Sequence, residues 1–508
     1  MFELLKQRIM LRKIRITLGL IFFIGATLLF LDFTGTIHAW LGWIAKVQFL
    51  PAVFAMNLAI VAGLVAITLL FGRVYCSVIC PMGVLQDIIA KFGKWSKKNR
   101  YSYSPALNVW RYTLFGVMII AIIFGIGSIV GMLAPYSSFG RIVHNLFGPI
   151  WIWGNNTLAG VAERMESYAF YSRELWIKNW ALFATSVRTV VAIGILAWKN
   201  GRTYCNSICP VGTFLGLLSR FSLYRPTIEL AKCNSCGLCA RNCKSACIDS
   251  KAHKIDYSRC VSCMDCIGKC HKQAIKYTYK RVKVESLEPA METVKSEVND
   301  SSRRNFLGLM AFVGGAALMD AAEKTVDGGL AVIEDKKIPT RNKHISPPGS
   351  KGHVNIASRC TGCQLCVTVC PNHVLRPSGN LANFMHPVAS YERGYCRPEC
   401  TKCSEVCPTG AIQKIDLAEK SSIQIGRAQW VKENCIPLTD GVSCGNCERH
   451  CPVGAIQMVA SVAGDEESLK IPAVDTEKCI GCGACEHLCP SRPFSAIYVE
   501  GNEKHRYV

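Results

Sequence analysis

The sequence predicts an α-helical bundle of membrane spans joined to small α+β domains that are rich in cysteine. Three observations support this fold class. Hydrophobic residues make up 50% of the chain, and the mean hydropathy is positive at +0.22. Four long apolar stretches lie in the first half of the 508 residues. The 29 cysteines, far more than an ordinary domain contains, fall almost entirely into short runs of regular spacing.

The formal net charge of +22 would allow nucleic-acid binding, but the positions of the basic residues favour a membrane protein. Many of them crowd the ends of the apolar stretches, as in the cytoplasmic loops of bacterial membrane proteins. They are Lys6, Arg8, Arg12, Lys13 and Arg15 before the first stretch, and Lys91, Lys94, Lys97, Lys98 and Arg100 after the second. We therefore expect a multi-pass protein of the bacterial cytoplasmic membrane, with no nucleic-acid partner.

The predicted spans form a four-helix membrane domain over residues 1–230, which we call the helical region. Each stretch is long enough to cross about 30 Å of hydrocarbon. The flanking charges place the 72–110 loop and the chain after residue 199 in the cytoplasm, and residues 134–179 on the opposite side. The four predicted spans are residues 15–34, 50–71, 111–133 and 180–198.

An internal repeat follows the second and fourth spans. The sequence GRVYCSVICPMG at 72–83 and the sequence GRTYCNSICPVG at 201–212 share the pattern G-R-x-Y-C-x-x-x-C-P-x-G. If the two copies pack about a pseudo-two-fold axis, their four thiols converge at one membrane face. Such a set could bind a metal or an iron–sulfur cluster, form a redox dithiol pair, or pack at a docking surface. The four residues are Cys76, Cys80, Cys205 and Cys209.

Residues 231–280, the first cysteine-rich region, contain CNSCGLCARNC and CVSCMDCIGKC. Both have the C-x2-C-x2-C-x3-C spacing of bacterial 4Fe–4S ferredoxins, in which three thiolates wrap one cluster and the fourth reaches the companion cluster. A structural zinc site commonly separates its cysteine pairs by a longer loop. The run therefore predicts a cytoplasmic two-cluster domain of bacterial ferredoxin type. Its expected ligands are Cys233, Cys236, Cys239, Cys243, Cys260, Cys263, Cys266 and Cys270.

Residues 357–508, the second cysteine-rich region, contain four more quartets, each ending in Cys-Pro. They predict a four-cluster ferredoxin-like domain, and six 4Fe–4S clusters in the whole chain. In bacterial ferredoxins, neighbouring quartets pair by exchanging their fourth cysteines. In a nested scheme the outer two quartets would pair with each other, and so would the inner two. The insertions inside the second and third quartets favour the nested scheme. The expected ligands are Cys360, Cys363, Cys366, Cys370; Cys396, Cys400, Cys403, Cys407; Cys435, Cys444, Cys447, Cys451; and Cys479, Cys482, Cys485, Cys489.

One cysteine, Cys247, is left over after the quartets and the membrane repeat are assigned. Alignment of the segments after each quartet places it in the position held by Ala274, Ala411 and Ala455. We therefore expect a small buried residue beside a cluster, with an alternative ligand as the other interpretation.

Between the two cysteine-rich regions lies SSRRNFLGLMAFVGGAALM at 301–319, which has the paired arginines and Gly/Ala-rich apolar run of a twin-arginine export signal. Polar linkers are expected on both sides, at 281–302 and 323–356. We expect the signal, residues 303–322, to be retained as a fifth membrane anchor and the following domain to be periplasmic. The alternative is a short helix packed on a soluble domain.

These motifs in this order resemble two known proteins joined end to end. Residues 1–280, with four spans, CSVICP, CNSICP and two quartets, resemble the NapH-type membrane component of quinol dehydrogenases. Residues 300–500, with SRRNFLG, PPG and four quartets, resemble the NapG/MauM-type periplasmic ferredoxins. Gly308 departs from the signal pattern, in which lysine is common there. The membrane motif is shared with NosR and CcoG proteins, so the resemblance does not by itself assign the function.

The resemblance implies an oxidoreductase subunit that takes electrons from the quinol pool and passes them along 4Fe–4S clusters to a c-type cytochrome or periplasmic reductase. The alternatives are a maturation or assembly factor for a periplasmic metalloenzyme, and a redox scaffold of a larger respiratory complex. No nucleotide-binding fingerprint and no Ser/His/Asp constellation is found, which argues against a hydrolase or an NAD enzyme. Tyr136, Arg141 and His144 are either hydrogen-bond partners for a quinone oxygen or ordinary interfacial residues.

Overall fold

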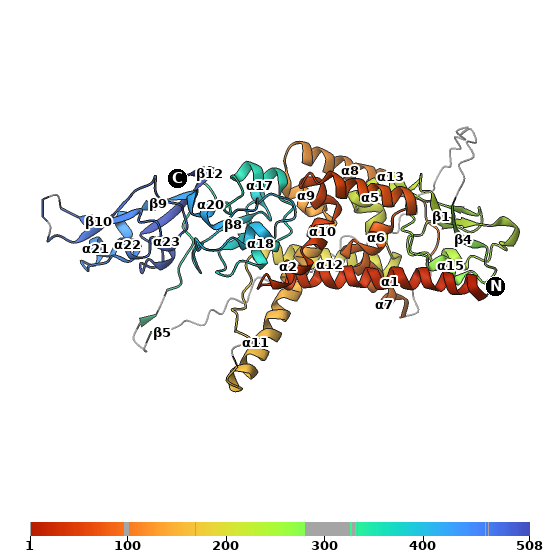
Figure 1. The fold of residues 1–508 in the computed structure, drawn as a ribbon, viewed down its shortest axis with the longest axis horizontal. Helices are drawn as coiled ribbons and strands as arrows, with labels where there is room; N and C mark the ends of the chain where they lie inside the picture. The colour runs from red at the N-terminus through yellow and green to blue at the C-terminus, as the bar shows by residue number, and fades with distance from the viewer. Residues whose placement is uncertain are drawn as a thin grey trace, which may run out of the picture. The chain divides into compact units, whose positions relative to one another are not determined.

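The computed structural model of the chain describes residues 2–95, 101–167, 169–279, 326–327, 331–332, 334–462, 464–465 and 467–508 (Figure 1). Met1–Lys280 and Lys337–Val508 form one compact unit, and Arg281–Lys336 form a second. In the second unit, β5 (Val326–Asp327) pairs antiparallel with β6 (Ala331–Val332). The predicted linker at 281–302 and the predicted anchor at 303–322 lie outside the described residues.

Two helices of the helical region are long and apolar enough to cross a membrane, counting only the part of the chain that the structure describes. One is the segment Met10–Leu31 of α1 (Phe2–Leu31), and the other is α12 (Trp180–Asn200). They correspond to the first and fourth predicted spans.

The second and third predicted spans are each broken into two helices. Residues 50–71 lie in α4 (Phe49–Phe54) and α5 (Leu58–Phe71), and residues 111–133 lie in α8 (Asn108–Ile123) and α9 (Gly127–Leu133). Asn57 starts α5 because its side chain accepts a hydrogen bond from the Ile60 amide at 3.2 Å. Gly125, at φ +68°, separates α8 from α9. At 14 and 16 residues, α5 and α8 are shorter than the about 20 residues of an ordinary span.

Short helices connect these longer ones. The prolines of the repeated motif start helices, since Pro81 begins α7 and Pro210 begins α13. The remaining elements of the helical region are α2 (Thr36–Leu41), α3 (Trp43–Lys46), α6 (Val74–Val78), α7 (Pro81–Trp95), α10 (Pro135–Ile142), the π-helix η1 (Val143–Phe147), α11 (Gly148–Arg164), the π-helix η2 (Tyr204–Ile208) and α13 (Pro210–Ser219).

The first cysteine-rich region consists of short elements around its two quartets. Strand β1 (Tyr224–Ile228) pairs antiparallel with β4 (Ile275–Tyr279), so that the two ends of the region meet in one ladder. Between them lie η3 (Leu230–Lys232), α14 (Leu238–Arg241), β2 (Ile248–Asp249), β3 (Lys254–Ile255) and α15 (Asp265–Lys269), with β2 and β3 paired antiparallel.

The second cysteine-rich region contains two such modules in sequence. The first module has α17 (His353–Arg359), α18 (Leu365–Thr368), β7 (Leu375–Pro377), η5 (Leu381–Asn383), β8 (Pro387–Ala389), α19 (Lys402–Glu405) and α20 (Leu417–Ser422). The second has β9 (Ile423–Trp430), η6 (Lys432–Asn434), α21 (Ile436–Thr439), α22 (Asn446–Arg449), β10 (Ile456–Ala460), β11 (Lys470–Val474), α23 (Ala484–Leu488) and β12 (Ile497–Tyr507). The pairs β7–β8, β9–β12 and β10–β11 are all antiparallel.

Part of the predicted linker at 323–356 is core rather than linker. Ile345 is fully buried and bridges to Ala389, and Ser346 and Ser350 are also buried. Composition misled the prediction here, because Ser, Pro and Gly are as suitable for a tightly packed turn as for a linker.

The two cysteine-rich regions contact opposite ends of α1. Near the N-terminal end, Arg12 forms an ion pair of 2.8 Å with Asp265 of the first region. Just beyond the C-terminal end, the Thr34 carbonyl accepts a hydrogen bond of 2.9 Å from Lys402 of the second region. The helical region therefore holds one cysteine-rich region at each end of its longest helix.

Candidate iron–sulfur sites

In the second cysteine-rich region, the first two quartets exchange their fourth cysteines. Cys407 interacts electrostatically with Cys360, Cys363 and Cys366 of the first quartet. In return, Cys370 lies beside Cys396 and Cys403 of the second.

The last two quartets pair in the same way. Cys489 interacts with Cys435 and Cys447, and Cys451 interacts with Cys479 and Cys482. Of these, Cys435, Cys447, Cys451, Cys479 and Cys489 share one cluster with Trp430, Ile456 and Ile497.

The nested pairing expected from the insertions is therefore wrong. Neighbouring quartets pair, because the three-residue opening gap of Cys396–Cys400 and the eight-residue gap of Cys435–Cys444 are accommodated locally as loops. An insertion inside a quartet lengthens one turn and leaves its partner quartet in place.

The first cysteine-rich region follows the same scheme. Cys243, the last cysteine of the first quartet, interacts with Cys263 and Cys266 of the second. Cys239 and Cys270 pack in the same buried cluster.

The cysteine environments fit iron–sulfur clusters. Backbone amides donate to the sulfur atoms of Cys360, Cys407, Cys451 and Cys489 at 3.2–3.4 Å, as expected where a thiolate carries negative charge. Burial raises the pKa of the Cys447 thiol to about 11, so that ionisation needs a bound cationic centre. The sets would supply four thiolate ligands each, while the redox chemistry belongs to the clusters.

Cys247 is buried at 1% exposure, the same value as Ala274, Ala411 and Ala455 in the corresponding positions. This confirms the expected small buried residue. Its sulfur lies 3.5 Å from that of Cys243.

The four cysteines of the membrane repeat also come together. All four are buried at 4% exposure, and Cys205 and Cys209 both interact electrostatically with Cys76. Gln86 donates a hydrogen bond to the sulfur of Cys205 at 3.1 Å. Among the described residues, no group of three or more Cys, His, Asp or Glu side chains is arranged to hold a single metal ion.

The arginines of the repeat connect its two copies, a role that sequence reasoning missed. Arg73 donates to the Cys205 carbonyl at 3.0 Å, and Arg202 donates to the Cys76 carbonyl at 2.7 Å. Both arginines are fully buried. The signal was present in the G-R-x-Y-C pattern, where each copy carries an arginine three residues before its first cysteine.

Asp87 of α7 neutralises this buried charge. Its carboxylate lies 2.8 Å from Arg202, 3.0 Å from Arg15 and 3.5 Å from Lys244 of the first cysteine-rich region. Burial opposes ionisation of Asp87, but Arg202 and Lys244 outweigh it and hold its pKa well below the usual range.

The two modules of the second cysteine-rich region meet at a cysteine contact. The Cys396 amide donates to the Cys482 carbonyl at 2.9 Å, and the Tyr391 hydroxyl donates to the Gly481 carbonyl at 2.7 Å. The second and fourth quartets are therefore adjacent, which joins the two modules.

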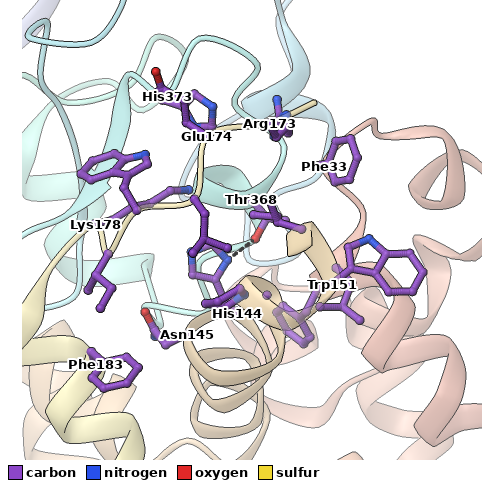
Figure 2. Close-up of a pocket in the computed structure, with 18 residues that line it drawn as sticks. Phe33, His144, Asn145, Trp151, Arg173, Glu174, Lys178, Phe183, Thr368 and His373 are labelled. Carbon is purple, nitrogen blue, oxygen red and sulfur yellow. Dashed lines mark hydrogen bonds between the residues drawn. The ribbon is translucent and has the colours of Figure 1, made fainter. Parts of the chain in front are cut away.

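The predicted outer-loop residues have separate surroundings. Tyr136 and Arg141 are buried, and Arg141 donates to the Gly131 carbonyl at 2.7 Å and to Ser138 at 2.9 Å. His144 instead lines a pocket, where it contacts Thr368 of the second cysteine-rich region (Figure 2).

Family descriptions match both parts of the chain. The description "4Fe-4S binding domain" matches residues 53–100 and 182–227, which contain the two copies of the membrane repeat. The description "4Fe-4S dicluster domain" matches residues 359–411 and 442–492, the two modules of the second cysteine-rich region. No solved structure matches the chain.

Several curated relatives are ferredoxin-type proteins. The chain is 30% identical over 172 residues to the methylamine utilization ferredoxin-type protein MauM of Methylophilus methylotrophus, covering 32% of this chain and 72% of that protein. It is 27% identical over 177 residues to the ferredoxin-type protein NapG of Escherichia coli, covering 32% of this chain and 75% of NapG.

A third relative, YccM of Escherichia coli, is 26% identical over 228 residues, covering 44% of this chain. The chain spans only 55% of the length of YccM. With its paired cysteine quartets and its match to most of the MauM sequence, the chain belongs to the ferredoxin-type iron–sulfur electron-transfer proteins.

Proposed function

We propose that the protein is a membrane-bound quinol dehydrogenase component that holds six 4Fe–4S clusters and passes electrons from the quinol pool through those of residues 357–508 to a c-type cytochrome or periplasmic reductase. The observation that carries this proposal is the set of four cysteine sites in residues 357–508, whose two modules join at Cys396 and Cys482. Several cluster sites in adjoining modules suit stepwise electron transfer. A structural role alone would not need four of them in sequence.

The helical region supports a membrane location. Ile21 and Ile24 of α1 are 56% and 54% exposed, and Ile123 of α8 is 73% exposed. Apolar side chains exposed in this number are stable in lipid rather than in water. From Arg12 to Phe30, α1 rises about 27 Å, close to the thickness of the hydrocarbon layer.

The two attachments to α1 support clusters on both sides of the membrane. The first cysteine-rich region contacts Arg12, in the basic segment that the charge pattern places in the cytoplasm, and the second contacts the far end. The second region would then be periplasmic, as expected if residues 303–322 act as an export signal.

The four thiols of the membrane repeat support a further redox centre on the cytoplasmic side. Cys76, Cys80, Cys205 and Cys209 are buried together, and the matching family description is of a 4Fe–4S binding domain. The same thiols also support the second candidate function, an assembly factor that handles metal for a periplasmic enzyme.

Reduction of the purified protein by a quinol analogue tests the proposal. We expect duroquinol to bleach the cluster absorbance of the full-length protein in detergent, and iron analysis to give about 24 irons per chain for six clusters. No bleaching by duroquinol, although dithionite bleaches the same sample, would exclude the quinol dehydrogenase.

The variants Cys76→Ala and Cys205→Ala separate the two candidate functions. If these variants are still reduced by duroquinol but the partner enzyme fails to mature in cells, the assembly factor is supported. If both variants lose electron delivery to the partner while the partner still matures, the electron-transfer function is supported.

A further inference from the structure

The pocket beside His144 lies where the helical region meets the first module of the second cysteine-rich region (Figure 2). Its walls come from the C-terminal end of α1, from η1 and the start of α11, from residues 173–178, and from α18. All of these segments belong to one compact unit.

Aromatic side chains line this pocket together with charged ones. Phe33, Trp151 and Phe183 lie on different sides of the space around His144, as Figure 2 shows. The Arg173 guanidinium lies 4.6 Å from the centre of the Phe33 ring, so Trp151 and Phe183 are the rings suited to hold a flat aromatic ligand by stacking and edge contacts.

His144 presents a hydrogen-bond acceptor here. The single hydroxyl hydrogen of Thr368 is donated to the Gln364 carbonyl at 3.1 Å. The Nδ1 atom of His144 lies 2.8 Å from the same hydroxyl oxygen, so Nδ1–H donates in the tautomer that matches donation by Thr368 to Gln364. Burial lowers the pKa of His144 well below its usual value and keeps the ring neutral, and in this tautomer Nε2 is an acceptor.

The pocket also adjoins two cysteine sets. Thr368 lies between Cys366, which belongs to the set completed by Cys407, and Cys370, which belongs to the set of Cys396. Lys178, another lining residue, donates to the Val367 carbonyl at 3.0 Å and interacts electrostatically with both Cys370 and Cys366.

Apolar surface continues from the pocket onto the neighbouring helices. Trp180 at the start of α12 is 60% exposed, and Ile150 and Trp153 of α11 are 63% and 66% exposed. An aromatic head group in the pocket could therefore carry an apolar tail that lies along surface suited to lipid.

We propose that this pocket binds the quinol head group, with a quinol hydroxyl donating its hydrogen bond to Nε2 of His144. This inference rests on the proposed function and adds the place where the substrate binds. Oxidation of one quinol to the quinone breaks two O–H bonds and releases two electrons and two protons. The cysteine sets that contain Cys366 and Cys370 would hold the 4Fe–4S clusters that accept these electrons, one each. The protons leave to water, while Nε2 of His144 orients the quinol hydroxyl.

A pair of glycine substitutions on α11 tests the site. Gly148 lines the pocket, and a side chain there would enter open space, since only the Val143 carbonyl lies within 4 Å of an added Cβ, at 3.9 Å. Gly154, on the same helix, has nothing within 4 Å and does not line the pocket. We expect Gly148→Phe to slow cluster reduction by duroquinol at least tenfold, and Gly154→Phe to leave it unchanged.

Dithionite, which needs no quinol site, should reduce the clusters equally in both variants and in the unaltered protein. Normal reduction of Gly148→Phe by duroquinol would overturn the site, while the proposed function would stand. Failure of the unaltered protein with duroquinol would instead overturn the proposed function, so the two failures are distinguishable.

The hydrogen bond to His144 is tested separately with His144→Gln. Glutamine keeps a side chain able to donate to Thr368 but cannot also place an acceptor where Nε2 lies, so we expect a lower maximal rate with duroquinol and normal reduction by dithionite. The matched control is His450→Gln, because His450 is exposed on the second module. Equal rates of reduction by duroquinol in the two variants would show that His144 does not bind the quinol.

Discussion

The two cysteine-rich regions are similar in chemistry but are attached to the helical region in different ways. Both approach it closely through glycines, since a Cβ added at Gly201 would lie 2.5 Å from the Lys244 carbonyl of the first region, and one added at Gly131 would lie 2.8 Å from the Thr361 carbonyl of the second. The first region adds a network of ion pairs of low exposure, in which Asp265 pairs with Lys244 at 3.0 Å and Lys244 also reaches Asp87. The second region adds the exposed pair Arg393–Glu174 at 2.8 Å.

Chain connection explains the difference. The first region follows α13 directly, so its position is already limited, and ion pairs need only fix the final orientation. The second region is separated from the helical region by residues 281–336, so the contact surface itself must specify its place. Glycines packed against carbonyl oxygens allow only one relative position of the two surfaces, whereas long charged side chains can change conformation to keep an ion pair.

Substitution of Asp87 should have the largest effect on the charged attachment. Asp87→Asn leaves the fully buried Arg202 without its carboxylate, which we expect to cost about 3–5 kcal/mol of unfolding free energy. Urea unfolding in detergent measures this, with Glu433→Gln, an exposed site, as the control. A loss as small as that of the control would show that the charge is compensated elsewhere.

The same carboxylate gives a pH dependence with a defined sign. Because the folded state lowers the pKa of Asp87, its stabilising contribution is complete above about pH 4, the ordinary carboxyl range, and is lost as the pH falls through the lowered pKa. In Asp87→Asn this part of the acid destabilisation should be missing.

A single methyl group should test the glycine attachment. We expect Gly131→Ala to lower the unfolding free energy by about 1–3 kcal/mol through overpacking, and to expose residues 357–408 to protease. Gly116→Ala is the matched control, because nothing lies within 4 Å of its added Cβ, and alanine there should stabilise the helix by up to about 1 kcal/mol. The same stabilisation in Gly131→Ala would contradict a tight fit.

The exposed ion pair between Arg12 and Asp265 should contribute less to the free energy of unfolding. The Arg12 side chain is 49% exposed, so we expect Arg12→Gln to cost about 0.2–1 kcal/mol, and the loss to shrink as salt is added. The effect of Gly131→Ala, measured in the same salt series, should not change. A salt-independent loss in Arg12→Gln would show that packing of its stem matters more than its charge.

The smallest effect is expected at Cys247. Cys247→Ala installs the residue that stands at positions 274, 411 and 455, so iron content and stability should be nearly unchanged. Cys243→Ala should lose about four irons, the content of one cluster. Loss of iron in Cys247→Ala would establish it as a ligand in the first cysteine-rich region.

Sequence predicted what depends on local spacing and missed what depends on distant contacts. The 4Fe–4S quartets, the membrane repeat and the buried position of Cys247 all follow from residues within a few positions of one another. The pairing of quartets did not, because the loop inserted before Cys444 hides that Cys435 belongs beside Cys489. The lining of the pocket was missed because it comes from four distant segments, although His144 itself was a candidate.

The helical spans illustrate the same limit. Hydropathy found apolar residues at 50–71 and 111–133 but not the breaks within them, which depend on single residues such as Asn57 and Gly125. The burial of Ile345 was missed because a Ser/Pro/Gly segment that packs in a core looks like a linker until its partner, Ala389, is known.

The crossed arginines have a consequence for the origin of the helical region. Arg73 binds the carbonyl of Cys205 in the other copy, and Arg202 binds that of Cys76, so each half completes its neighbour as in an intramolecular dimer. A half expressed alone would bury a guanidinium without its acceptor, unless two such halves assembled around the same contact. The duplicated motif is therefore compatible with an ancestral homodimer whose subunits became one chain and can no longer be separated without loss.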